Sequence, residues 1–204
     1  MAWSRRFTLA LSPAILLCGV MQLIKPDLAH LDGFRDALSK GWSPNNLRPE
    51  ASQEILSAIS EDAAAYVATL DDMDGKGAPV TLPDGSKVPR LPGFNRWIWD
   101  DGFCGSVGFR WQPGGAELPS YCHGHIGYTV VPWRRGQGYA RHALALLLDE
   151  VRPLGLPYVE LTTEHDNIPS QKVMEANGSV LVGATHKPGR HGDSEMLLYR
   201  IALT

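Results

Sequence analysis

Two arginines and two glycines stand between an apolar run and a helical pattern near the middle of the chain. In the stretch VVPWRRGQGYARHAL, Arg134 and Arg135 are followed by Gly136 and Gly138, and an amphipathic helix is expected directly afterwards. The first amides of a helix lack intrahelical partners and carry the positive end of its dipole, so they attract anions. Glycine lets an oxygen approach the backbone, and arginine adds a planar pair of donors. This order of residues predicts a site for phosphate oxygens.

Three other interpretations of the same stretch are possible. A P-loop needs Lys and then Ser or Thr after its last glycine, and these residues are missing. A dinucleotide fingerprint needs Gly or Ala where this chain has Arg141. A plain strand–turn–helix joint with surface arginines is the third, and the four residues alone do not separate it from a phosphate site.

Metal chemistry has little support in the sequence. Cys122, His123 and His125 are close together, and two histidines two residues apart on a strand can chelate an ion. No third and fourth ligand is evident, and no C-x-x-C pair occurs, so no metal site is expected. Three cysteines in all, with Cys18 and Cys104 the other two, cannot form a disulfide framework.

Length and composition limit the class of protein. The 204 residues are enough for one domain with a substantial core, and 44% hydrophobic with 20% charged residues fits a globular protein. The formal net charge of -3 provides no basic field, so no nucleic-acid partner is expected. No membrane partner is expected either. A homodimer remains open, because no heptad or dominant exposed stripe is evident.

The N-terminus needs a separate interpretation. Arg5 and Arg6 precede the apolar run Phe7–Val20, which has the outline of a secretory signal but is too short to span a bilayer. Ser12 and Pro13 interrupt the run, and no small-residue cleavage site follows. We therefore expect residues 1–20 to be a non-native extension or a signal-like segment, residues 21–204 to be the functional domain, and the protein to be cytoplasmic. An exported or lipid-anchored protein is the alternative that rests on this segment.

The elements that position these residues follow from periodicity and turn chemistry. Apolar spacing predicts helices near 28–38 and 50–70, the latter with Asp62 as an internal cap, then an excursion at 71–95 without period. A hairpin around Asp101-Gly102 and a strand at 124–132 come next. The remaining expected elements are a core-facing helix over 140–151, a strand at 158–163, a capped helix at 166–178 and two closing strands. This order predicts an α+β fold with one parallel crossover.

Two segments together resemble the GCN5-related N-acetyltransferase (GNAT) family. The family's acetyl-CoA loop reads [QR]-x-x-G-x-[GA], and here Arg135-Gly136-Gln137-Gly138-Tyr139-Ala140 follows that pattern. About thirty residues later, DNIPSQKVMEANG is similar to the family's motif B, with matching Asn167, Ser170 and Asn177-Gly178. The resemblance is specific from about 124 to 202, looser from 21 to 111, and does not reach residues 1–20.

The resemblance implies a fold, a co-substrate and a binding mode. The expected fold is a mixed, mostly antiparallel sheet with flanking helices and a splayed parallel strand pair. Acetyl-CoA is the expected co-substrate, with its pantetheine arm bound as an added strand beside Val130 and Val131, where a backbone N–H would polarise the thioester carbonyl. The residues expected to bind the coenzyme are Val130, Val131, Arg135, Gly136, Gln137, Gly138, Tyr139, Ala140, Asn167 and Ser170. A helix cap is the alternative role for Asn167, and the two roles are compatible.

Acetyl transfer to an amine also needs a base for the ammonium and an acid for the departing thiolate. His125 is the first candidate base, with an ordinary pKa of about 6.5, and Glu160 is the second. A hydrogen-bonded strand histidine and an arginine-paired glutamate are the duller alternatives. Many members of the family use a motif-B tyrosine as the acid, but the matching residue here is Met174. Tyr128 and Tyr139 are substitutes by residue type only, and water or the substrate could also donate the proton.

The expected function is acetyl-CoA-dependent N-acetylation, by direct transfer, of a primary amine on an unidentified small molecule or peptide. A non-catalytic acyl-CoA-binding sensor or accessory module is the alternative, because the motif-B tyrosine is missing. For the acceptor, Trp42, Trp97, Trp99 and Trp111 could line a pocket or pack in the core. The excursion at 71–95 and the loop at 112–120, with Glu117, could close over such a pocket.

Overall fold

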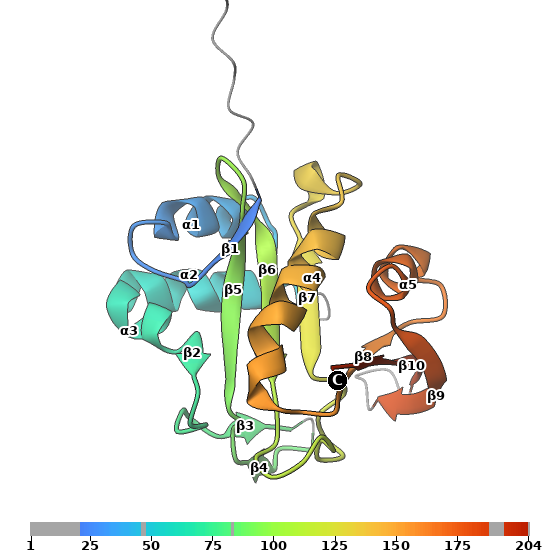
Figure 1. The fold of residues 1–204 in the computed structure, drawn as a ribbon. Coiled ribbons are helices and arrows are strands. Elements are labelled where there is room, and N and C mark those ends of the chain that lie inside the picture. The colour runs from blue at the N-terminus through green and yellow to red at the C-terminus, as the bar shows by residue number, and fades with distance from the viewer. Residues whose placement is uncertain (1–20, 46–47, 83, 188–193, 204) are drawn as a thin grey trace, which may run out of the picture.

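The computed structural model describes residues 21–45, 48–82, 84–187 and 194–203, so the interpretations of residues 1–20 fall outside the described part. The strands form two main sheets that lie side by side (Figure 1). The first contains β1 (Gln22–Ile24), β2 (Asp71–Asp72), β5 (Gly93–Trp99), β6 (Phe103–Arg110) and β7 (Ile126–Val130). The second contains β8 (Tyr158–Thr163), β9 (Val180–Lys187) and β10 (Ser194–Ala202). Every ladder between these strands is antiparallel.

Three helices cover one face of the first sheet. They are α1 (Leu31–Ser39), α2 (Ala51–Glu61) and α3 (Ala63–Ala68). The helix expected from residue 28 begins at Leu31, while Leu28 is 56% exposed. Gly41 ends this region with a φ of 84°, in the left-handed region that glycine tolerates. The Asp62 side chain accepts a hydrogen bond from the Ala65 amide at 2.9 Å and so caps α3, as the sequence predicted.

These helices pack on the aromatic hairpin formed by β5 and β6. Trp97 is 1% exposed, and its ring stacks on Phe34 of α1 with centroids 5.0 Å apart. Trp42 is also buried and donates its indole N–H to Thr129 Oγ1 at 3.3 Å. Trp99 packs against the same cluster. These tryptophans therefore serve the core, and the alternative that they line an acceptor pocket is wrong for Trp42 and Trp97.

One hydrophobic core lies between the first sheet and the helices α1–α3. Another lies on the opposite face of the first sheet and continues under the second sheet. In Figure 1, α4 (Tyr139–Val151) crosses in front of β5, β6 and β7, and α5 (Ile168–Glu175) lies beside the second sheet. The expected apolar stripe of α4 is buried, with Ala143, Leu144, Leu147 and Val151 at 0% exposure. Two short 3-10 turns flank α4: η1 (Pro132–Arg134) and η2 (Arg152–Leu154).

The excursion at 71–95 is better ordered than its sequence indicates. It contains β2, a small hairpin of β3 (Val80–Thr81) with β4 (Lys87–Val88), and the start of β5. The Asp72 carboxylate accepts from the amides of Lys76 and Gly77 at 2.9 and 2.8 Å, which closes a tight turn. Local side-chain-to-backbone bonds of this kind leave no periodic pattern, so the expectation of a structureless stretch was wrong.

No helix within the described residues is long and apolar enough to cross a membrane.

Candidate functional site

The N-terminus of α4 presents open amides on a glycine turn. Gly136 and Gly138 have φ of 76° and 85°, and Gly138 is the N-cap residue, with no side chain capping the helix. The first intrahelical bond runs from the His142 amide to the Gly138 carbonyl at 3.1 Å, so the amides before it have no helical partner. A Cβ at Gly136 would meet no atom of the described residues within 4 Å. The turn is therefore open to a ligand and suited to an anion.

The two arginines of this turn have different surroundings. Arg135 is exposed and donates from Nε to the Val130 carbonyl at 3.2 Å, so its guanidinium lies at the end of β7. Arg134 lies 3.4 Å from the Tyr139 hydroxyl, which itself donates to Asp100 at 2.7 Å. The hydrogen bond to Asp100 raises the pKa of Tyr139 to about 12. Arg134 and Tyr139 thus anchor the turn to the β5–β6 hairpin, and Arg135 is the arginine available to a ligand.

β7 and β8 meet at one point and then separate. The His125 amide donates to the Glu160 carbonyl at 2.7 Å, just before β7 begins. Beyond that bond the two strands belong to different sheets. Because the Val131 amide donates to the Cys104 carbonyl at 3.0 Å, strand alternation turns the amide of Val130 toward the edge that faces β8. Of the two amides expected to polarise a carbonyl, only that of Val130 is on the open edge.

A hydroxyl pair bridges the gap between β7 and α5. The Tyr128 hydroxyl lies 2.8 Å from Ser170 Oγ and 3.2 Å from the Ser170 carbonyl oxygen. Burial raises the pKa of Tyr128 to about 12, against the effect of the Ser170 hydrogen bond. Asn167 caps α5 by accepting from the Ser170 amide at 3.2 Å, so its capping role is confirmed. The structure therefore brings Tyr128, Asn167 and Ser170 together, while Met174, 1% exposed, is a core residue.

His125 is fully buried at the junction of the two strands. Its Nδ1 accepts from the Glu160 amide at 2.9 Å, and its Nε2 is buried, with the Ala116 backbone as the neighbouring polar group. Burial lowers the pKa of His125 to about 4, although the Glu160 charge acts in the opposite direction. The ring is therefore neutral near pH 7. Because Nδ1 is an acceptor, the remaining proton lies on Nε2.

Glu160 is the carboxylate beside this junction. Its Oε1 accepts from Arg200 at 2.6 and 3.2 Å, and the two residues are direct neighbours across the β8–β10 ladder. The guanidinium of Arg200 also lies 3.9 Å from the centre of the Tyr158 ring. The Glu160 side chain is 16% exposed and lines a hollow of about 170 Å³ with His123 and Thr162. The pairing with arginine that the sequence left open is thus present, and Glu160 also lines a cavity.

Among the described residues, no group of three His, Cys, Asp or Glu side chains is placed to hold a metal ion.

Sequence reasoning missed two features of this site. Arg200 was not expected as the partner of Glu160, and only the strand register, which places them opposite each other, identifies it. The contact between Tyr128 and Ser170 joins residues 42 positions apart, and no sequence pattern encodes it.

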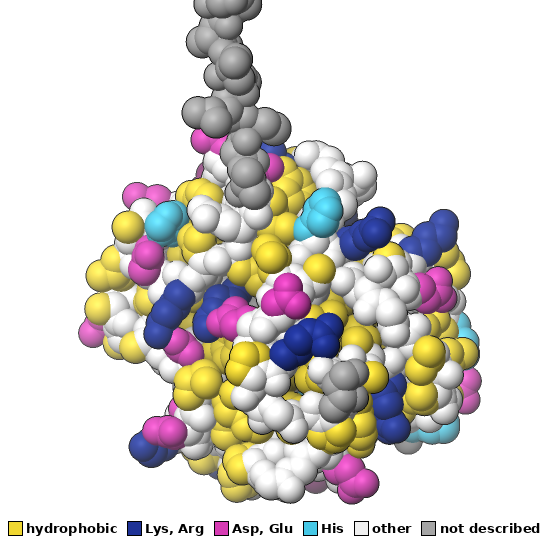
Figure 2. Space-filling view, viewed as in Figure 1, with side chains coloured by type: hydrophobic (Ala, Val, Ile, Leu, Met, Phe, Trp, Pro, Cys, Tyr) yellow, Lys and Arg dark blue, Asp and Glu magenta, His cyan; other side chains and the backbone are white. Residues whose placement is uncertain are grey.

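Basic side chains lie near the end of the gap between β7 and β8 where an anion would bind (Figure 2). Figure 2 shows basic side chains between the start of α4 and α5, whereas acidic and basic groups are interspersed over the rest of the viewed face. An anion held by open amides at a helix start is further stabilised by such cations.

Comparisons with known proteins support this picture of the fold. The sequence profile described as "Acetyltransferase (GNAT) domain" matches residues 42–180. A search of curated protein sequences finds no match.

Several solved structures share the fold at low sequence identity. One is RimL, a ribosomal L7/L12 alpha-N-protein acetyltransferase in complex with coenzyme A, with TM-score 0.60 and 14% identity over 93% of this chain and 96% of that chain. Another is the microcin C7 self-immunity acetyltransferase MccE with acetyl-CoA and AMP, with TM-score 0.58 and 14% identity over 89% and 92%. Mycobacterium smegmatis RimJ in complex with CoA-disulfide has TM-score 0.55 and 20% identity over 90% and 82%.

Proposed function

This chain belongs to the GNAT acetyltransferase family, and from that premise we propose that it transfers the acetyl group of acetyl-CoA directly to a primary amine. Acetyl-CoA is the co-substrate. The single observation that carries the proposal is the combination of open amides at the start of α4 with an edge of β7 that pairs with no further strand of the described residues and leads away from them.

The described residues fit the coenzyme in three places. The diphosphate fits the amides between Gly136 and Arg141, with the Arg135 guanidinium as an additional donor. The pantetheine arm has the length and the alternating amides of an extended peptide, so it can bind the free edge of β7 as an added strand. Asn167 and Ser170 would contact the coenzyme from the α5 side of the gap.

The amide of Val130 is suited to stabilise the reacting carbonyl. When the amine attacks, negative charge develops on the thioester oxygen, and a fixed backbone N–H near that oxygen lowers the barrier. The Val131 amide is already bonded to Cys104, which leaves the Val130 amide on the edge beside the gap.

Glu160 is better suited than His125 to remove the proton of the attacking ammonium. A base needs a free lone pair, and the lone pair of His125 Nδ1 is bonded to the Glu160 amide while Nε2 carries the proton. The Arg200 contacts of Glu160 are both to Oε1. Oε2 would therefore receive the proton of the attacking ammonium, either directly or through a water molecule. His125 would then act as a positioning residue that fixes the backbone of Glu160.

Tyr128 is the proposed acid for the departing thiolate. Collapse of the tetrahedral intermediate breaks the carbon–sulfur bond, and the coenzyme sulfur must gain a proton. The Tyr128 hydroxyl carries its proton at neutral pH, as an ordinary tyrosine with a pKa of about 10 also does, and Ser170 Oγ can pass a proton to it or stabilise the thiolate. A tyrosine on the strand would thus replace the tyrosine that Met174 cannot supply.

A two-stage experiment tests this proposal. Calorimetric titration with acetyl-CoA is expected to show saturable binding, and a panel of primary amines is expected to accelerate release of the CoA thiol with formation of the N-acetyl product. Binding without turnover on any amine would favour a sensor or accessory module, the alternative suggested by the buried Met174. Absence of acetyl-CoA binding would contradict both functions. The reaction is expected in the cytoplasm, where acetyl-CoA is available.

A further inference from the structure

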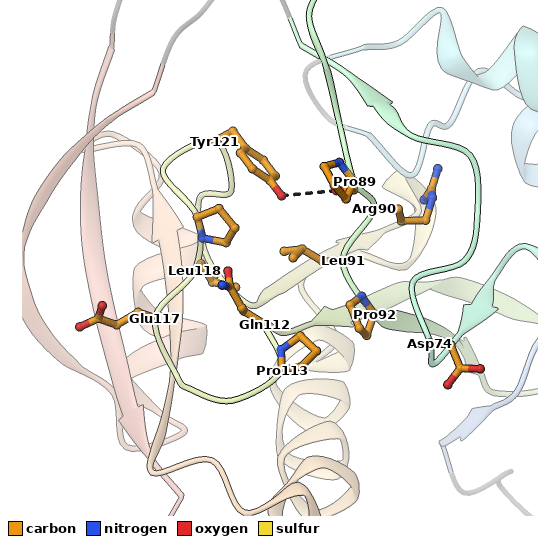
Figure 3. Close-up of a pocket in the computed structure, with 11 residues that line it drawn as sticks. Asp74, Pro89, Arg90, Leu91, Pro92, Gln112, Pro113, Glu117, Leu118 and Tyr121 are labelled. Atoms are coloured by element: carbon orange, nitrogen blue, oxygen red, sulfur yellow. Dashed lines mark hydrogen bonds between the residues drawn. The ribbon is translucent and has the colours of Figure 1, made fainter.

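A second, larger cavity lies at the other end of the first sheet from the start of α4. It has a volume of about 590 Å³ and is formed by residues 89–92 of the excursion and by the loop between β6 and β7. Figure 3 shows Leu91 in the middle of this space, with Leu118 and Pro113 facing it from the opposite loop. A space of this volume is within the range of small-molecule sites, and it is widely open to solvent. We name it the outer pocket.

The walls of the outer pocket are rigid and combine apolar side chains with polar groups. Four of its lining residues are prolines, at positions 89, 92, 113 and 119, and their φ angles are fixed. The Tyr121 hydroxyl donates to the Pro89 carbonyl at 3.3 Å, which ties the two loops together (Figure 3). The Trp111 amide donates to the Pro92 carbonyl at 3.1 Å, which ties the excursion to the end of β6. A preformed pocket of this kind loses little conformational entropy when a ligand binds.

Charged groups lie around the outside of the outer pocket. In Figure 3 Asp74, Arg90 and Glu117 surround the apolar centre, and Glu117 points away from Leu91. Arg90 is bonded through Nε to the Ala78 carbonyl at 3.1 Å, so its charge is held on the excursion. Leu91, Leu118 and the prolines therefore offer apolar contacts, while the Gln112 amide beside them and the charged groups outside offer polar ones (Figure 3).

The outer pocket adjoins the hollow that contains Glu160. Both cavities are lined by Leu118 and Pro119, so one molecule can contact both across these two residues. Beside the hollow, Glu117 and Glu160 both interact electrostatically with Arg200, and the Arg110 guanidinium donates to the carbonyl of Gly124, which also lines the hollow. An ammonium group can donate to Glu160 Oε2, which the Arg200 contacts do not use, whereas an apolar group cannot.

We propose that the outer pocket holds the body of the acceptor and that it selects a small amine whose nitrogen is joined to an apolar, aromatic group. This proposal rests on the acetyl transfer proposed above. The amine nitrogen lies in the hollow beside Glu160, and the aromatic group lies among Leu91, Leu118 and the prolines. The selectivity thus comes from two loops that lie outside the coenzyme site.

A matched pair of amines tests the proposal without requiring turnover. Calorimetry on the full chain saturated with CoA compares 4-phenylbutylamine with butylamine. Burial of the phenyl ring is expected to make the former bind about tenfold tighter or more. In Leu91→Asp the preference is expected to fall below about threefold, because a carboxylate enters the apolar centre. Leu91→Met is expected to keep the preference, since it conserves volume and polarity.

A control variant lies outside the outer pocket. Leu28→Asp changes a leucine that is 56% exposed near α1, and it is expected to leave the preference unchanged. Equal affinity of the two amines for the native protein, or a preference that survives in Leu91→Asp, would overturn the proposal. Loss of CoA binding in Leu91→Asp would mark a general folding defect, and the preference is then measured in Tyr121→Phe. This variant loses the hydrogen bond that ties the two loops together, so the ratio of the two amine affinities is expected to fall. An unchanged ratio would refute the proposal. The proposed function fails separately, if amines bind and no acetyl group is transferred.

Discussion

Replacing Gly138 by alanine separates the fold from the phosphate site. Gly138 has φ +85°, and a Cβ in this left-handed region costs about 1–2 kcal/mol. The nearest atoms, in the His142 ring, would be 3.7 and 3.8 Å away, so no steric clash adds to that strain. For a chain of this size about 1 kcal/mol lowers the Tm by about 2–4 °C, so Gly138→Ala is expected to lose about 2–8 °C.

The coenzyme provides the second, specific effect. The new Cβ would stand where the diphosphate approaches, and loss of one charge-assisted hydrogen bond of about 1.5–3 kcal/mol weakens CoA binding about tenfold to a hundredfold. Gly41→Ala is the matched control, because Gly41 has φ +84° with no atom within 4 Å and ends α1. Thermal unfolding and calorimetric titration with CoA should show similar Tm losses in both variants and weaker binding only in Gly138→Ala. Equal CoA affinity in the two variants would refute the phosphate site.

Three further changes test other parts of the account. Tyr128→Phe removes the hydroxyl that lies 2.8 Å from Ser170, and it should lower kcat in a thiol-release assay about a hundredfold with little change in CoA affinity; an unchanged kcat excludes Tyr128 as the acid. Burial lowers the pKa of His125 to about 4 in the folded protein, whereas the unfolded chain has the ordinary value of about 6.5. As the pH falls below about 6.5, the unfolded chain therefore binds a proton that the folded protein does not yet bind. Relative to His125→Asn, the native protein should therefore lose up to about 3 kcal/mol of unfolding free energy between pH 7 and pH 4, as measured by urea titration, and parallel pH profiles would contradict this. Gly105→Ala would place a Cβ 2.2 Å from the Thr129 carbonyl oxygen and force β6 and β7 apart, so unfolding in urea should show a loss of at least about 2 kcal/mol; a native midpoint would show that the strands adapt.

Local patterns were sufficient to predict most elements of the fold. The stripe of α4, the Asp62 cap and the left-handed Gly41 each depend on residues within one or two turns, and all three are present in the structure. The β5–β6 hairpin is also set locally, by the turn at Asp101 and Gly102. The order within the excursion at 71–95 was not predicted, because it depends on single hydrogen bonds such as those of Asp72.

The site was predictable only where its chemistry lies in one segment. The glycine turn and Arg135 are continuous in sequence, and the structure places them at the start of α4 as expected. The contacts of Glu160 with Arg200 and of Tyr128 with Ser170 join distant segments, so they depend on strand register and helix packing. For the same reason residue type alone favoured His125 as the base, since its buried environment follows from the junction of two strands.

A crystal structure of the protein with CoA is the measurement that bears most directly on the whole account. The account predicts the diphosphate on the amides that follow Gly136 and the pantetheine chain along the edge of β7, with the sulfur close to Tyr128. Coenzyme bound elsewhere, or β7 and β8 joined by a continuous ladder with no space between them, would contradict it.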